Sequence, residues 1–119
     1  MIDRTLVYRG TGTIKANGTQ IGKADSLNLI FQAVGLEQTN EKNSCYGVIT
    51  GSITEKSLIP QWNIHKETDA ELEAKIEPAK GGQPLWIVVK KITFINDIPH
   101  DGTLDSEEFH GESEVLASK

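Results

Sequence analysis

The chain has 119 residues and a mass of 13.1 kDa, a size that suits one compact domain with its own hydrophobic core. Hydrophobic residues make up 37% and charged residues 24% of the sequence, which excludes an intrinsically disordered chain. The net charge of −5 excludes the strongly basic proteins that bind nucleic acid or anionic membranes, because no surplus of lysine and arginine is present to contact phosphates.

The first predicted element is a β-hairpin around Asn17-Gly18. An Asn-Gly pair supplies the positive φ angles of a type I′ turn, whose twist matches that of two antiparallel strands. Apolar and polar residues alternate on both arms of the hairpin, at residues 11–16 and 19–24. Residues 5–8 are β-branched and aromatic, so they extend the first arm into a long strand.

Two further strands are predicted at residues 25–34 and 45–54, where apolar side chains again occupy alternate positions. In the second of these strands, Gly47 and Gly51 share one face. Glycines on one face indicate that another backbone passes close by, or that the strand bends at a barrel corner. The polar residues 35–44 between the two strands are predicted to form an exposed loop.

Three segments follow in the second half of the chain. Residues 57–64 are predicted to be a short extended segment at an edge or in a connection, because Pro60 has no backbone N–H to donate. Residues 68–77 alternate apolar and charged side chains, which favours a strand, although their composition leaves a helix as the alternative. Residues 85–95 are the most apolar, so we predict a strand covered on both faces, with a bulge where two lysines break the alternation.

These elements predict an all-β protein, either a single small antiparallel β-barrel or a β-sandwich of six to eight strands. Residues 1–100 are expected to form the β-domain and residues 101–119 an acidic C-terminal tail. The tail holds six acidic residues against Lys119, whereas residues 1–100 hold eleven residues of each sign. Such a tail is either solvated and partly disordered or a docking peptide for a basic surface of a partner.

No segment of the sequence indicates export or membrane insertion. The longest apolar run, residues 85–89, is far shorter than the about 20 residues of a membrane-spanning helix. Residues 1–4 lack the basic start of a signal peptide. The single cysteine, Cys45, has no partner for an internal disulfide, which is usual in a reducing compartment. We therefore expect a cytoplasmic protein that binds neither nucleic acid nor a membrane.

The strongest metal-binding motif lies in residues 97–108. Its second half has carboxylates spaced around a central glycine, as at the end of an EF-hand calcium loop. Pro99, at the third loop position, offers no side-chain oxygen, and a strand rather than a helix is predicted before the loop. The sequence favours a plain acidic turn, with a looser calcium site as the alternative. The candidate metal ligands of that site are Asp97, Asp101, Asp105 and Glu108.

Aromatic residues provide the second candidate site. In a small barrel, inward aromatic side chains can line a cavity for a small apolar ligand, although more often they fill an ordinary core. The candidate ligand-binding residues are Phe31, Trp62, Trp86 and Phe94.

No motif in the sequence is typical of catalysis. It has no nucleophile elbow, no phosphate-binding loop and no metal-ligand spacing of its histidines, and Cys45 has no basic neighbour. We therefore expect a non-catalytic β-domain that acts through protein–protein contact, as a structural subunit or a partner-binding module, by self-association or with another protein. The alternatives are a ligand-binding or isomerase-like β-barrel with an aromatic-lined cavity, and a calcium-binding loop at residues 97–108.

Overall fold

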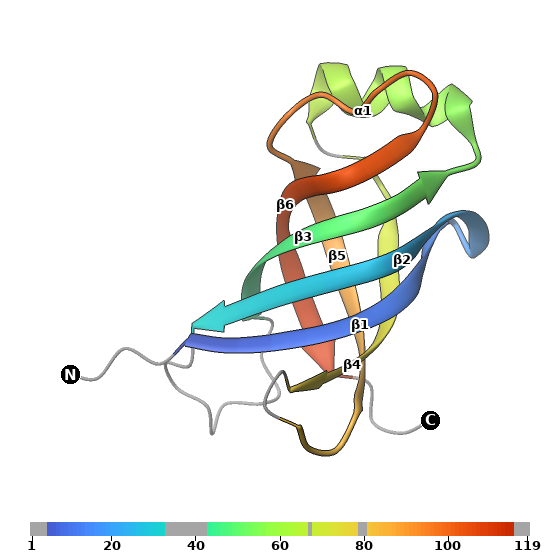
Figure 1. Ribbon diagram of the computed structural model, residues 1–119. Helices are drawn as coiled ribbons and strands as arrows, with labels where there is room; N and C mark the ends of the chain where they lie inside the picture. The colour runs from blue at the N-terminus through green and yellow to red at the C-terminus, as the bar shows by residue number, and fades with distance from the viewer. Residues whose placement is uncertain (1–4, 33–42, 67, 79–80, 116–119) are drawn as a thin grey trace.

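The computed structural model describes residues 5–32, 43–66, 68–78 and 81–115. Six antiparallel strands close into a barrel in the order β1-β2-β3-β6-β5-β4, in which β4 pairs with β1 (Figure 1). The prediction of a small all-β fold is confirmed, and the strands form a barrel rather than a sandwich. The elements are β1 (Thr5–Ala16), β2 (Thr19–Gln32), β3 (Asn43–Ile53), the 3-10 helix η1 (Lys56–Leu58), α1 (Ile59–His65), β4 (Glu71–Pro78), β5 (Leu85–Phe94) and β6 (Thr103–Val115).

The first hairpin is formed by β1 and β2, as predicted. Asn17 and Gly18 connect the two strands with φ angles of 53° and 81°, both positive as a type I′ turn requires. The strands are long, and their register shifts between Gly10 and Gly12. This irregularity is a β-bulge, which strengthens the local twist and helps a sheet to close on itself.

Residues 71–78 form strand β4, so the prediction of a strand rather than a helix is confirmed. Leu72, Ala74 and Ile76 are almost fully buried, whereas Glu71 and Lys75 on the opposite face are exposed. An α-helix would turn by 100° per residue and spread these apolar side chains around its circumference. Only a strand places them on one face toward the core.

Strand β5 has the predicted bulge, and its outer face is covered at Val88 but not along its whole length. Its register with β6 shifts between Lys90 and Thr93, and Lys91 has a φ angle of 56°. On the inner face Ile87 and Val89 belong to the core. On the outer face Val88 is only 6% exposed. It lies opposite Glu73 and Glu114, which form ion pairs with Lys15 and Lys90. The long side chains of these pairs lie beside it on the outer surface.

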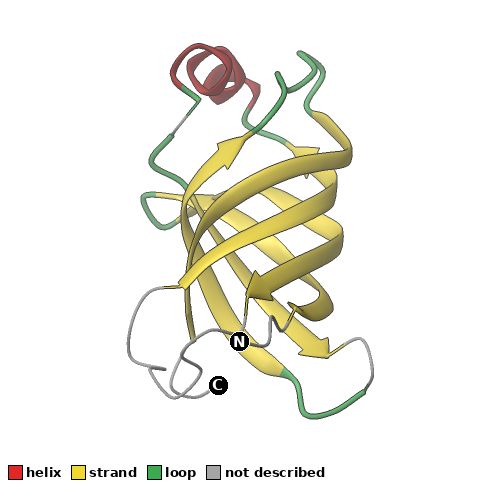
Figure 2. Cartoon of the chain, turned by 90° about the vertical axis from the view of Figure 1, so that its left-hand side faces the viewer, coloured by secondary structure: helices red, strands yellow, loops and turns green. Residues whose placement is uncertain are grey.

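The prediction of an extended segment at residues 57–64 is wrong, because these residues form the end of η1 and most of α1. Pro60 lies in the first turn of α1. Donors in that turn have no acceptor within the helix, so a proline costs nothing there. Ile59 and Trp62 are fully buried, and α1 lies across one end of the barrel (Figure 2).

The prediction of an acidic tail from residue 101 is wrong for residues 103–115, which form β6 between β3 and β5. Inward-facing Leu104 and Phe109 belong to the core. Carboxylates occupy outward positions, where Glu112 forms an ion pair with Lys91 at 3.5 Å. The number of charges alone does not reveal that this segment is a strand with apolar side chains on its inward face.

The loop predicted at residues 35–44 lies almost entirely outside the described residues. Within the part of the chain that the structure describes, no helix is long and apolar enough to cross a membrane.

Candidate functional site

The interior near α1 is filled with apolar side chains. Trp62 and Phe94 meet edge to face, with ring centroids 5.1 Å apart, and Phe109 lies 6.0 Å from Phe94. The space between these rings and their neighbours is too narrow for a water molecule. Trp62 and Phe94 therefore pack as core residues in this part of the barrel. The side chains around this space are Ile14, Ile49, Trp62, Leu72, Ile92, Phe94 and Phe109.

The structure does not bring the four aromatic candidates together. Trp86 is half-buried on the outer face of β5, opposite Lys75 of β4, while its neighbour Ile87 faces the core. The Lys75 ammonium lies 5.9 Å from the Trp86 ring centroid, a cation–π contact on the surface. Phe31 pairs with Cys45 through its backbone, and its side chain lies outside the described part of the structure.

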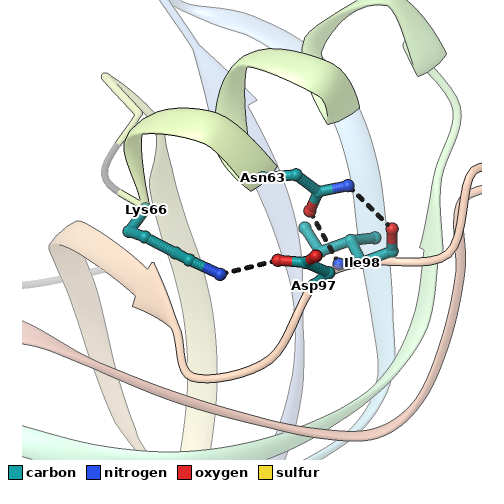
Figure 3. A network of polar contacts seen from close by, with 4 residues as sticks. All are labelled: Asn63, Lys66, Asp97 and Ile98. Carbon is teal, nitrogen blue, oxygen red and sulfur yellow. Dashed lines mark hydrogen bonds and ion pairs between the residues drawn. The ribbon is translucent and has the colours of Figure 1, made fainter.

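Helix α1 is fastened to the loop between β5 and β6 by polar contacts (Figure 3). The Asn63 amide donates from Nδ2 to the Ile98 carbonyl at 3.1 Å, and its Oδ1 accepts the Ile98 N–H at 2.8 Å. Lys66 Nζ lies 2.6 Å from Asp97 Oδ1. Trp62 Nε1 donates to the Ile92 carbonyl at 3.2 Å. The Asn63 side chain thus replaces the backbone partner that buried Ile98 lacks in this loop.

We expect Asn63→Ala to lower the free energy of unfolding by about 1–3 kcal/mol, because both backbone groups of Ile98 lose their partner. Lys66→Gln is the control, since an exposed ion pair contributes about 1 kcal/mol or less. Urea unfolding followed by circular dichroism measures both. An equal loss in the two variants would show that the Asn63 amide contributes no more to stability than the exposed ion pair does.

The four acidic candidates have different surroundings. Asp97 contacts Lys66, and Tyr46 donates a hydrogen bond to Glu108. The Thr103 N–H donates to Asp101 Oδ1 at 2.9 Å and thereby lowers the pKa of Asp101. Among the described residues, no three histidine, cysteine or acidic side chains lie close enough to hold a metal ion. The structure therefore does not gather these carboxylates into a calcium site.

Cys45 is buried on the inner face of β3. Burial raises the pKa of its thiol to about 11, and hydrogen bonds from the Gly111 backbone and the Ser113 side chain offset part of that rise. At neutral pH the sulfur is therefore a neutral thiol, which is a poor nucleophile.

We expect Cys45 to resist an aromatic disulfide reagent at pH 8 in the native protein and to react fully in urea. Stability should also fall as the pH rises from about 9 to about 11, because over that interval the unfolded chain releases the thiol proton and the folded chain keeps it. Below pH 9 this group should have no effect. Urea unfolding of Cys45→Ala and of the unchanged protein at both ends of this pH range isolates the contribution of the thiol to stability. Fast labelling of the thiol in the native protein would contradict its burial.

The outer surface of β1, β2 and β3 carries apolar side chains outside the core. Val7 lies opposite Ile30, and Ile30 lies opposite Tyr46 on the next strand. Val48 is the next outward residue along β3. Val7 is 39% exposed, and the other three are half-buried. We call Val7, Ile30, Tyr46 and Val48 the outer patch; Figure 1 looks onto the strands that carry it.

Opposite charges lie on the two sides of the outer patch. Arg9 of β1 lies opposite Asn28, Asn28 opposite Val48, and Val48 opposite Glu108 of β6. The Tyr46 hydroxyl donates to the Glu108 carboxylate, which raises the pKa of Tyr46. The patch is therefore an apolar strip with a cation on one side and an anion on the other.

A shallow depression of about 340 Å³ continues the outer surface beyond Tyr46. It begins at His110, which lies opposite Tyr46 on β6, and reaches the bulge of β5 at Lys91. Most of the residues that line it are polar, so the outer patch has polar residues along this border. The residues that line it are Ser44, Cys45, Lys91, Thr93, His110, Gly111 and Glu112.

Sequence reasoning missed the outer patch, although a signal for it was present. Ile30, Tyr46 and Val48 are apolar residues in the outward phase of strands whose inward phase is already apolar. A barrel strand needs only one apolar phase for its own core. The second phase would have indicated a contact surface, but the pairing of the strands was needed to show that these residues are neighbours.

Comparison with known proteins gives no match to a protein family, a curated protein or a solved structure. The candidate site is therefore judged from its own geometry. The interior near Trp62 has no room for a water molecule, and no group of described residues is arranged to hold a metal ion, so the outer patch is the strongest candidate.

Proposed function

We propose that this protein is a non-catalytic β-barrel module that acts by contact with another protein chain through the outer patch. The observation that carries the proposal is the group of apolar side chains on the outside of β1, β2 and β3, where the barrel's own core does not use them. Apolar side chains gathered on one exposed face and bordered by polar groups are typical of protein interfaces.

The contrast with the outer face of β5 strengthens this proposal. There the apolar Val88 is 6% exposed and lies beside two ion pairs. On the patch, Val7 remains 39% exposed. The proposed contact uses a sheet face rather than the strand edge that Pro60 suggested, because closing the barrel pairs the strands with one another.

The two alternative functions have less support. A ligand cavity lined by the four aromatic candidates conflicts with the packing of Trp62 and Phe94 and with the outward position of Trp86. A calcium site conflicts with the placement of the candidate ligands, because no three acidic, histidine or cysteine side chains among the described residues lie close enough to hold a metal ion. Thermal unfolding with a panel of apolar ligands and with millimolar calcium tests both, because any ligand of the native state raises Tm. We expect no rise, and a saturable rise would favour the corresponding alternative.

The outer patch itself is tested by Val48→Lys, with Ile49→Lys as the matched control. Val48 faces outward and is half-buried, whereas Ile49 faces the core and is 2% exposed. We expect Val48→Lys to lower Tm by no more than a few degrees and Ile49→Lys to prevent stable folding, because a buried unpaired ammonium is very costly. Equal losses would mean that Val48 is part of the core, which would contradict the proposal.

A further inference from the structure

We infer that the contacting partner is a second copy of this chain and that the outer patch forms the interface of a two-fold dimer. This inference rests on the proposed function and adds the identity of the partner to it. It is carried by the order of charges across the patch and by the register of the four strands that hold them.

The charges on the two sides of the outer patch are self-complementary. Arg9, Asn28, Val48 and Glu108 lie on one line across β1, β2, β3 and β6. A two-fold axis that runs parallel to the strands, between β2 and β3, reverses this line in the second copy. Arg9 of each copy then faces Glu108 of the other, which makes two opposite-charge contacts from one surface.

A second line of outward residues runs from Val7 through Ile30 and Tyr46 to His110, and the same axis pairs its members. Ile30 of one copy faces Tyr46 of the other, and Val7 faces His110 at the border. The centre of the contact then combines Ile30, Tyr46 and Val48 with the Asn28 amide, while Arg9, Glu108 and His110 lie at its two sides, as in an interface whose rim is polar. An axis along the line, at right angles to the strands, would instead place Arg9 of one copy against Arg9 of the other. Like charges disfavour that alternative.

Arg9 is available for such a contact. It is exposed, and among the described residues it forms no ion pair, although Glu77 lies opposite it on β4. The Glu108 carboxylate accepts a hydrogen bond from Tyr46 and so is held at the other side of the patch. A carboxylate can accept several hydrogen bonds, so it can contact an arginine as well.

The patch has few side chains, so the interface would belong to the small and weak class. We therefore expect an equilibrium between monomer and dimer that depends on concentration. Sedimentation equilibrium of the full chain, from micromolar to millimolar protein, should give a mass that rises from 13.1 kDa toward twice that value. The rise should be smaller at high salt, because the contact includes ion pairs.

Charge exchange tests the geometry. Arg9→Glu alone and Glu108→Arg alone each place like charges together at both ends of the dimer, so each variant should stay monomeric. An equimolar mixture of the two variants should dimerise again, because in the mixed pair every contact joins opposite charges. Glu71→Arg, an exposed carboxylate of β4 away from the patch, is the control and should dimerise as the unchanged protein does. Equal Tm values would show that all variants are folded.

A mass of 13.1 kDa at every concentration would overturn the dimer. The proposed function would not fall with it, because contact of the outer patch with a different protein does not require a dimer of this chain. A dimer that persists in both single variants, or a mixture that stays monomeric, would overturn this interface.

Discussion

Trp62→Ala is expected to lower the free energy of unfolding by about 3–5 kcal/mol, as removal of a large buried aromatic side chain usually does. Trp62 is 1% exposed and packs edge to face on Phe94. Its indole N–H also satisfies the Ile92 carbonyl at 3.2 Å. The variant would lose the ring that fills the end of the barrel under α1. The total free energy of unfolding of a domain is only about 5–15 kcal/mol, so this variant would be barely stable.

Trp86→Ala is the matched control for that experiment. Trp86 lies half-buried on the outer face, where its described interaction is the contact with Lys75. We expect it to cost about 1 kcal/mol or less, the usual value of an exposed cation–π contact. Each variant keeps one tryptophan, so urea unfolding can be followed by the fluorescence of the other. If Trp86→Ala were as costly as Trp62→Ala, the assignment of inner and outer tryptophans would fail.

Gly51→Ala is expected to destabilise the barrel by about 3 kcal/mol or more, at the upper end of the costs of overpacking. A Cβ at this position would lie 2.0 Å from the Lys23 carbonyl oxygen and 3.0 Å from Ala24 Cα. Both are backbone atoms of β2, so no side chain can rotate away. The two strands would have to separate beside the bulge between Ala24 and Ser26.

Ser52→Ala is the control for the glycine variant. Ser52 is the next residue of β3 and is half-buried on the opposite face. The free energy of unfolding of Ser52→Ala should differ from that of the unchanged protein by no more than about 0.5 kcal/mol, as for most surface substitutions. Urea unfolding followed by circular dichroism compares the two. A Gly51→Ala protein as stable as Ser52→Ala would show that β2 and β3 are not in such close contact.

Local sequence was sufficient to predict the elements whose conformation depends on neighbouring residues. Asn17-Gly18 specifies its own turn, because few residues other than asparagine and glycine adopt positive φ angles without strain. The alternation in β4 and the lysines at the bulge of β5 also identified strand structure directly. In each case neighbours in the chain decide the conformation, so no distant contact had to be known.

Helix α1 and strand β6 were decided by tertiary structure. Residues 59–65 are helical because Ile59 and Trp62 are buried at the end of the barrel, and this burial outweighs the extended tendency inferred from Pro60. Glu108, Glu112 and Glu114 of β6 are tolerated because they face outward, while Leu104 and Phe109 pack inside. Composition cannot show this, because it counts charges without regard to the face that carries them.

The placement of the candidate sites also depended on the closed sheet. The sequence offers no sign of which tryptophan is buried, and only the closed barrel places Trp62 in the core and Trp86 on the surface. Arg9 and Glu108 are about 100 residues apart and are joined in one line only by the register of four strands. Pairing between distant strands is set by how their inward faces pack together. Local sequence patterns therefore identified the strands, whereas the outer patch exists only in the closed barrel.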